Sequence, residues 1–181
     1  MKKVYILLAD GFELIEALTP VDVLRRGGVD VKTVSITSEK NVMSGQEVLV
    51  KADTTLKETD LKDGDMLVLP GGNPGYINLG NSNEVVELIK FYIDNKKFVG
   101  AICGAPSILG NHNIALGKRV TCHTSLKELM KNHQYEEKNI VRDDKLITGM
   151  GAGQSLAFAF ELAETLLELD TINKIKTGME L

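Results

Sequence analysis

The chain has 181 residues, 43% of them hydrophobic, and a formal net charge of −4. This length and composition suit one globular domain, residues 1–181, with a full hydrophobic core. The acidic balance argues against a nucleic-acid surface, which is usually basic, and no apolar stretch is long enough to span a membrane. The apolar run that ends at Leu8 is too short for a signal peptide, so we expect a cytoplasmic protein.

The first third of the chain predicts a strand, a helix and a second strand. The apolar run 4–8 is typical of a strand buried on both faces, and apolar residues from Leu14 onward recur at helical spacing. Gly27-Gly28 is expected to end this helix in a left-handed cap, while Pro20 inside it predicts a kink or a late start. Residues 29–36 form the next predicted strand, and the short links indicate a right-handed parallel unit.

The rest of the chain continues this alternation. The predicted elements are a hairpin at 42–50, a helical turn within 53–63, strands at 66–69, 98–102 and 119–122, helices at 84–93, 125–130, 155–169 and 171–176, and a hairpin at 139–147. Strands that alternate with helices imply an open α/β sheet with helices on both faces. In such sheets ligands bind at the carboxyl ends of the strands.

Cys103 lies at one of these strand ends. It follows the apolar run 98–102 and precedes Gly104, Ala105 and Pro106. Because proline is favoured in the first turn of a helix, we expect Cys103 on a sharp strand-to-helix turn, like the nucleophile elbow of serine hydrolases. The unpaired amides of a helix start would favour a thiolate. The alternative is a buried cysteine that acts as a small hydrophobic residue.

Other polar groups are predicted at the same edge. Glu13 and Glu16 follow the first strand, and one of them could lie against the sulfur with a raised pKa, or both could be first-turn acids of a helix. Gly71 and Gly72 could present amides to an oxyanion, or form a plain turn. His123 could activate Cys103, or be structural.

The remaining cysteine, histidines and glycine-rich stretch carry weaker signals. Cys103 and Cys122 form no CxxC pair, so a zinc ribbon and a thioredoxin motif are excluded, and we expect Cys122 to be a packed thiol. His112 and His133 lie in polar stretches and are expected to be solvated. The stretch 149–153 comes too late in the chain for a dinucleotide fingerprint and predicts a tight loop near the site. We expect no metal and no cofactor.

Taken together, these motifs resemble the ThiJ/PfpI superfamily, and within it the branch of the Parkinsonism-associated protein and its bacterial relatives. The motifs that carry the resemblance, which covers essentially the whole chain, are residues 9–16, 20–28, 68–73, 101–106 and 121–123. It implies a flavodoxin-like three-layer sandwich with a mostly parallel sheet. It also implies a homodimer whose contact runs through the first helix, near Arg25 and Arg26.

The resemblance also assigns roles by position. Cys103 matches the reactive cysteine, Glu16 its partner carboxylate and His123 the nearby histidine. The backbone cradle corresponds to Gly71, Gly72 and Gly104. Gly104 stands where the protease-like branch has a histidine, and no His-x-Glu pair follows, so neither a peptidase nor a glutamine amidotransferase is expected.

The resemblance implies a cofactor-free enzyme for reactive carbonyls. The thiolate of Cys103 would attack an α-oxoaldehyde such as methylglyoxal, Glu16 would move a proton between adjacent carbons, and water would release lactate. A deglycase activity on glycated thiols and amines would use the same groups. The alternative is a redox-sensing, chaperone-like protein in which Cys103 is oxidised to a sulfinate.

Overall fold

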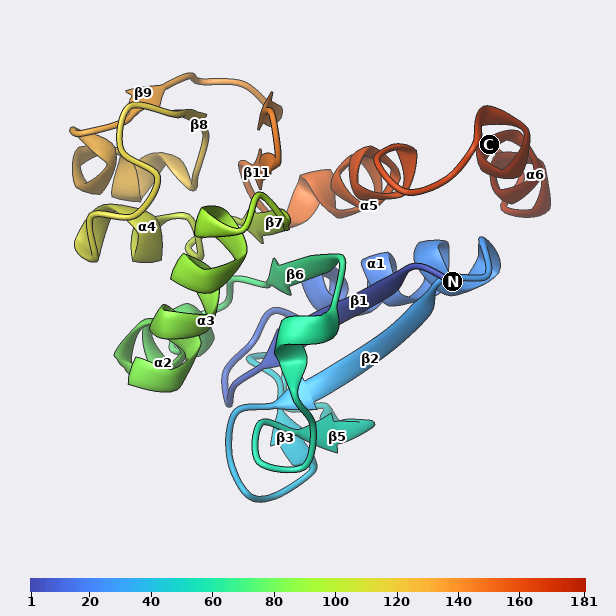
Figure 1. Ribbon diagram of the computed structural model, residues 1–181, viewed down its shortest axis with the longest axis horizontal. Helices are drawn as coiled ribbons and strands as arrows, with labels where there is room; N and C mark the ends of the chain where they lie inside the picture. Colours follow the sequence, from blue (N-terminus) through green and yellow to red (C-terminus); the bar gives the residue numbers. More distant parts are fainter.

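The computed structural model describes residues 1–181, which form a seven-stranded sheet between two layers of helices (Figure 1). The strand order is β10-β11-β7-β6-β1-β2-β5, and every neighbouring pair is parallel except β10 with β11. The strands of this sheet are β1 (Lys3–Leu8), β2 (Asp30–Ser35), β5 (Thr54–Thr55), β6 (Met66–Leu69), β7 (Phe98–Ile102), β10 (Ile140–Asp143) and β11 (Leu146–Gly149). The predicted α/β sandwich with a mostly parallel sheet is confirmed.

The two faces of the sheet carry different helices. One layer contains α2 (Gly75–Asn81), α3 (Asn83–Asp94), α4 (Ser107–Asn111) and the 3₁₀ helices η1 (Leu61–Asp63) and η2 (Thr124–Met130), and the other contains α1 (Leu14–Arg26), η3 (Ala152–Gln154), α5 (Ser155–Glu164) and α6 (Leu169–Gly178). Alternate residues of β1 supply both cores: Tyr5 and Leu7 pack in the first layer, and Ile6 and Leu8 in the second. This double burial explains why the strand is continuously apolar.

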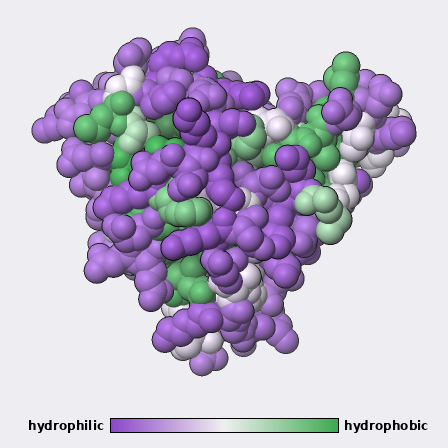
Figure 2. All heavy atoms as spheres, viewed as in Figure 1, coloured by the Kyte–Doolittle hydropathy of each residue, from purple (hydrophilic) through white to green (hydrophobic).

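Two small sheets flank the main one. The predicted hairpin at 42–50 is present as β3 (Asn41–Met43) and β4 (Leu49–Lys51), which pair antiparallel. β8 (Arg119–Val120) and β9 (Gln134–Tyr135) form a short parallel pair. The visible surface is largely hydrophilic, with small hydrophobic patches (Figure 2). None of the helices has the length and apolar character needed to cross a membrane.

The first helix differs from its prediction. α1 begins at Leu14 and runs without interruption through Pro20, so the expected late start is wrong. A proline inside a helix costs about 3 kcal/mol. Here the cost is offset by burial, because Ala17, Val23 and Leu24 lie in the core beside α5. The predicted left-handed residue at the helix end is Gly28, with φ of 76°.

The C-terminal helix prediction is also corrected. The predicted helix 155–169 is two helices, because α5 ends at Glu164 and α6 begins only at Leu169. At the break, the hydroxyl of Thr165 donates to the carbonyl of Leu162 (2.7 Å). Leu166 and Leu167 still pack on the core after α5 has ended, so the apolar pattern continues where the helix does not.

Candidate active site

Cys103 sits on a strained turn directly after β7. Its φ is 64°, in the left-handed region that non-glycine residues rarely adopt, and the turn is closed by the amide of Ala105 donating to the carbonyl of Ile102 (3.0 Å). Two further bonds hold this backbone: Cys103 donates to the carbonyl of Gly149 (2.9 Å) and accepts from the amide of His123 (2.8 Å). Strain of this kind persists only where the surroundings impose it, as at a nucleophile elbow.

The source of the amides around the sulfur differs from the prediction. α4 has only five residues and begins at Ser107, four residues after the cysteine. The amides of Ser107 and Ile108 donate to the carbonyls of Gly104 and Ala105, so they do not reach the sulfur. The expectation that a helix start stabilises the thiolate is therefore wrong. The amides that lower the pKa of the Cys103 thiol, and so favour its ionised form, belong to Gly72 and Gly104.

Glu16, the third residue of α1, lies beside this sulfur with no exposed surface. Its Oε2 accepts the amide of Gly71 (2.8 Å), whereas its buried Oε1 has no partner in ordinary hydrogen-bond geometry. Burial raises the pKa of Glu16 to about 7, and the neighbouring charge of Glu13 acts in the same direction. Hydrogen bonds from the Gly71 amide and the Cys103 thiol lower the pKa of Glu16.

The two acids titrate as a pair. Burial and the Glu16 carboxylate raise the pKa of the Cys103 thiol well above its ordinary value, while the amides of Gly72 and Gly104 lower it. An ionised Glu16 therefore disfavours ionisation of Cys103, and the protons leave in two separate steps. From about pH 7 into the alkaline range, the Glu16/Cys103 pair holds one proton and one negative charge.

The glycines after β6 allow the Glu16 carboxyl and Cys103 to lie close to each other. A Cβ on Gly71 would lie 2.7 Å from Oε2 of Glu16 and 2.8 Å from Cβ of Cys103. Gly72 has a φ of 90°, and a Cβ there would overlap the amide nitrogen of Glu13. The predicted cradle needs one correction: the amide of Gly71 is bonded to Glu16, which leaves the amides of Gly72 and Gly104 for the sulfur.

One residue near the site was missed by sequence reasoning. A Cβ on Gly104 would overlap the ring of Tyr76, so Tyr76 covers this glycine beside the nucleophile. Tyr76 belongs to α2, a short helix with two buried residues and no clear apolar period, which no sequence pattern indicated. The same tyrosine lines a small hollow of about 180 Å³ together with Ser107.

His123 is brought to the site by its backbone and not by its ring. The side chain is exposed, and its Nδ1 lies 2.8 Å from Oγ of Ser125. The ring makes no hydrogen bond to Cys103 or Glu16, so the geometry gives it no direct part in activating the sulfur.

The other histidines and the second cysteine lie elsewhere. The expectation of solvated histidines is wrong for His133, which is buried with Nε2 against the carbonyl of Ile114 (2.9 Å). His112 is half-buried and bonded to the carbonyl of Gly80 (2.9 Å). Cys122 is buried, as expected for a packed thiol. No three His, Cys, Asp or Glu side chains are grouped to hold a metal ion.

Arg25 and Arg26 lie at the opposite end of α1 from Glu16. Arg25 donates to the carbonyl of Val31 (2.9 Å) and forms an ion pair with Asp53 (2.8 Å). Arg26 forms an ion pair with Asp22 (3.0 Å). Both guanidinium groups are therefore engaged within the chain.

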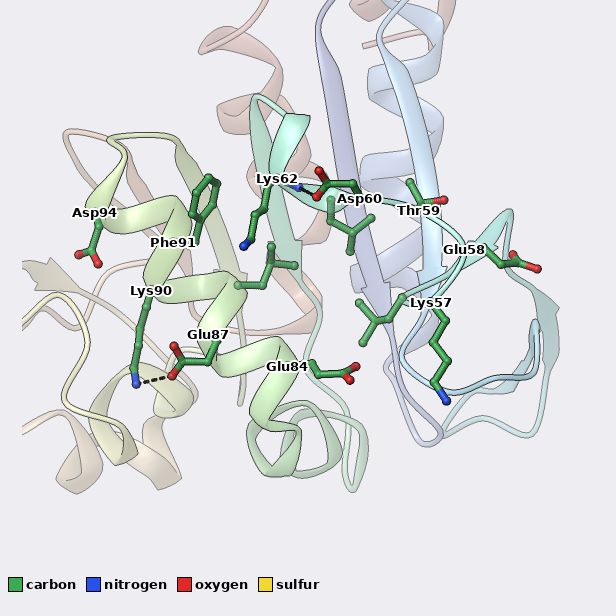
Figure 3. A pocket seen from close by; sticks show the side chains of 13 residues that line it. Lys57, Glu58, Thr59, Asp60, Lys62, Glu84, Glu87, Lys90, Phe91 and Asp94 are labelled. Carbon is green, nitrogen blue, oxygen red and sulfur yellow. Dashed lines mark hydrogen bonds and ion pairs between the residues drawn. The ribbon is translucent and has the colours of Figure 1, made fainter.

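A large hollow of the surface lies away from the cysteine. It is a groove of about 790 Å³ between α3 and the segment 56–62, with a charged rim on which Lys90 pairs with Glu87 (Figure 3). None of the groups around Cys103 lines it. The site is therefore assigned from its chemistry and not from the size of its hollow.

Comparison with known proteins identifies the family of this chain. The family model described as DJ-1/PfpI family matches residues 2–165. The chain belongs to the DJ-1/PfpI family. Within the DJ-1/PfpI family, it is 33% identical to protein dj-1beta of Drosophila melanogaster over 180 residues, which cover 98% of this chain and 96% of the relative. The crystal structure of that relative matches with a TM-score of 0.95, 32% identity and coverage of 99% and 98% of the two chains.

Two further DJ-1/PfpI relatives are similar. The Parkinson disease protein 7 homolog of Danio rerio is 34% identical over 183 residues, covering 98% of this chain and 96% of the relative. A Caenorhabditis elegans protein named glutathione-independent glyoxalase DJR-1.2 is 35% identical over 156 residues, covering 85% and 82%. The resemblance inferred from the sequence motifs is thus confirmed.

Proposed function

We propose that this protein is a cofactor-independent enzyme that converts α-oxoaldehydes such as methylglyoxal into 2-hydroxy acids, with Cys103 as the nucleophile. The observation that carries the proposal is the Glu16/Cys103 pair, which holds one proton and one negative charge at neutral pH. The glyoxalase name of the Caenorhabditis elegans relative supports the same reaction class.

The first step forms a carbon–sulfur bond. We place the pair's negative charge on sulfur and the proton on Glu16, because the amides of Gly72 and Gly104 favour the thiolate while burial favours the neutral carboxyl. The thiolate attacks the aldehyde carbon, and the carbonyl oxygen takes the proton of Glu16. The products are a neutral hemithioacetal and a Glu16 carboxylate.

The second step moves a proton between carbons. The Glu16 carboxylate removes the proton from the former aldehyde carbon and returns it to the adjacent carbon. The hydroxyl proton of the first carbon passes to the oxygen of the second. The first carbon is thereby oxidised to a thioester and the second reduced to an alcohol, so no external oxidant is needed. Water then cleaves the thioester to lactate and restores the pair. Because Cys103 supplies the thiol, glutathione is not required.

A deglycase activity follows from the same groups. An early adduct of methylglyoxal with a thiol or amine still carries the former aldehyde carbon. The Cys103 thiolate can displace the thiol or amine there, which leaves with the proton of Glu16, and give the same hemithioacetal and a Glu16 carboxylate. We therefore propose glycated thiols and amines as further substrates.

Lactate formation tests the proposal. Purified protein is incubated with methylglyoxal without glutathione, and lactate is measured for the wild type, Cys103→Ser and Cys122→Ala. We expect Cys103→Ser to fall to the buffer rate and Cys122→Ala, at the buried second thiol, to remain active. Lactate production by Cys103→Ser at the wild-type rate would rule out covalent catalysis at that residue.

Oxidation sensing is a second candidate function. The amides of Gly72 and Gly104 and a protonated Glu16 provide donors for the oxygens of a Cys103 sulfinate. Cys103 is half-buried and reachable, whereas Cys122 is buried. Intact-mass analysis during a peroxide titration distinguishes the two functions: selective gain of two oxygens at Cys103, without aldehyde turnover, favours sensing with a chaperone-like output.

We also propose that the protein forms a homodimer through α1. Exposed apolar side chains gather near the start of this helix: Ile15 on α1, and Val48 and Leu49 on the β3–β4 hairpin. The hairpin is tied to the helix start by the amide of Leu14, which donates to Gln46 (3.0 Å). A second copy of the chain would cover these side chains, and the contact would extend along α1 toward Arg25.

A further inference from the structure

Glu13 closes a ring of hydrogen bonds around the Glu16 carboxyl. Its side-chain Oε2 accepts the amide of Glu16 (2.8 Å), which makes Glu13 the N-cap of α1. Its own amide donates to the carbonyl of Gly71 (3.0 Å), and the amide of Gly71 donates to Oε2 of Glu16 (2.8 Å). The head of α1 and the turn after β6 are thus fixed to each other on both sides of the reactive carboxyl.

Capping alone does not require a glutamate. Serine, threonine, aspartate and asparagine are the preferred N-caps, since a short side chain reaches the amides of the first turn. Glu13 satisfies one amide and also places a carboxylate next to Glu16. Because the Glu16 carboxyl is buried, this charge is poorly screened by water.

The charge acts unequally on the two members of the pair. Four influences act on Glu16: its burial, the Gly71 amide after β6, the Cys103 thiol after β7 and the charge of Glu13. α5, which packs against α1, directs no charged group at it. The main influences on Cys103 do not include Glu13. Glu13 therefore disfavours negative charge on Glu16 more than on the sulfur.

We propose that Glu13 is a positioning residue: it fixes Glu16 through the head of α1, and its charge keeps the shared proton on Glu16 and leaves the negative charge on Cys103. This inference rests on the proposed function for its importance in catalysis. The location of the proton, however, is measurable without any substrate.

The test is the pH profile of Cys103 alkylation by iodoacetamide, followed by intact mass. Glu13→Gln is the decisive variant, because the amide oxygen still accepts the Glu16 N–H while the charge is removed. We expect the midpoint of its profile to fall by up to about 0.5 pH unit and its plateau rate by up to about 3-fold, the factor that half a pKa unit represents, because part of the negative charge moves from the sulfur to Glu16. Glu13→Asp keeps the charge and should restore both values.

The matched control is Glu84→Gln. Glu84 is an exposed first-turn glutamate of α3, so this variant changes the net charge equally, away from the site. It should leave the profile unchanged. A Glu13→Gln profile that coincides with that of the wild type, or an equal shift in Glu84→Gln, would overturn the inference.

The same variants separate this inference from the proposed function. If Glu13→Gln shifts the alkylation profile while the wild type forms no lactate, the positioning role stands and the proposed reaction fails. If the wild type forms lactate and the profile does not move, the proposed reaction stands and the positioning role is wrong.

Discussion

Glu16 has no exposed surface, and only one of its carboxyl oxygens accepts a hydrogen bond. A buried carboxylate with an unpaired oxygen is costly, and a proton on that oxygen removes the cost. The amides of Gly72 and Gly104 favour the thiolate of the adjacent Cys103, and a protonated Glu16 no longer opposes that thiolate with a charge. These unequal surroundings are the physical reason for placing the proton on Glu16 and the charge on Cys103.

Replacing Glu16 by glutamine tests its part in proton transfer. Glutamine can still accept the amide of Gly71, but it cannot carry a proton between carbons. We predict that Glu16→Gln lowers the rate of lactate formation by about 100-fold or more, the usual contribution of a positioned acid–base group. Alkylation of Cys103 should still proceed in this variant, which would show that the nucleophile is intact. An unchanged rate of lactate formation would exclude Glu16 as the proton carrier.

The same carboxyl should also affect stability with pH. The Glu16/Cys103 pair loses its first proton at about pH 7 in the folded protein, above the ordinary Glu16 pKa of 4.5, so the folded state binds this proton more tightly than the unfolded state. The stability that Glu16 provides is complete below pH 4.5 and is lost as pH rises through 7. A shift of this size corresponds to about 3 kcal/mol.

Urea unfolding at pH 5 and pH 8 measures this effect. We predict that the free energy of unfolding of Glu16→Gln, relative to the wild type, is greater at pH 8 than at pH 5 by about 2–3 kcal/mol. Glu84→Gln, an exposed control, should show no such gain. Equal differences at both pH values for Glu16→Gln would contradict the raised pKa.

At the scale of elements, the turn after β6 determines the geometry of the site. We predict that Gly71→Ala displaces the Glu16 carboxyl, because the new Cβ would lie 2.7 Å from Oε2 and 2.8 Å from Cβ of Cys103. Lactate formation should fall at least as far as in Glu16→Gln. The control is Gly153→Ala, since nothing lies within 4 Å of a Cβ at Gly153. Full activity in Gly71→Ala would show that this close approach is not needed.

The sequence was sufficient to predict the strand-to-helix turn at Cys103, but not which backbone amides lie near its sulfur. An apolar run followed by Cys103 and Pro106 predicts where the chain turns, because both signals are local. The amide of Gly72 reaches the sulfur only because the turn after β6, with its φ of 90° at Gly72, meets the end of β7. That contact is tertiary, and no local pattern contains it.

Helix boundaries were predicted less well for a similar reason. The apolar pattern from Ser155 continues through Leu167, so it gave no sign that α5 ends at Glu164. α2 has few buried residues and therefore no period to detect. Burial patterns report which side chains face the core, and they do not report whether the backbone between them remains helical.

At the scale of the whole molecule, strand order assembles the site. β1, β6 and β7 are neighbours in the sheet, so the segments that follow them bring Glu16, Gly71 and Cys103 together at one edge. This convergence was predictable, because parallel strands end at a common edge. The order itself also leaves the β3–β4 hairpin outside the main sheet, beside the start of α1.

The exposed hairpin gives a test of assembly. Leu49 is 57% exposed beside the start of α1 and makes no contribution to the buried core. We predict that the wild type elutes as a dimer in size-exclusion chromatography with light scattering, and that Leu49→Asp elutes as a monomer with the circular dichroism spectrum of the wild type. A substitution at the exposed Leu169 of α6, Leu169→Asp, should leave the dimer intact. A monomeric wild type would contradict the proposed interface.

The most direct test of the shared proton is the rate at which wild-type Cys103 reacts with iodoacetamide between pH 5 and pH 10. If the Glu16/Cys103 pair loses its first proton with the charge on sulfur, the rate rises with a midpoint near pH 7 and then remains level. A rate that stays low through pH 8 and rises only above about pH 9, as for an ordinary or buried thiol, would show that the sulfur keeps its proton and that the proposed nucleophile is not formed at neutral pH.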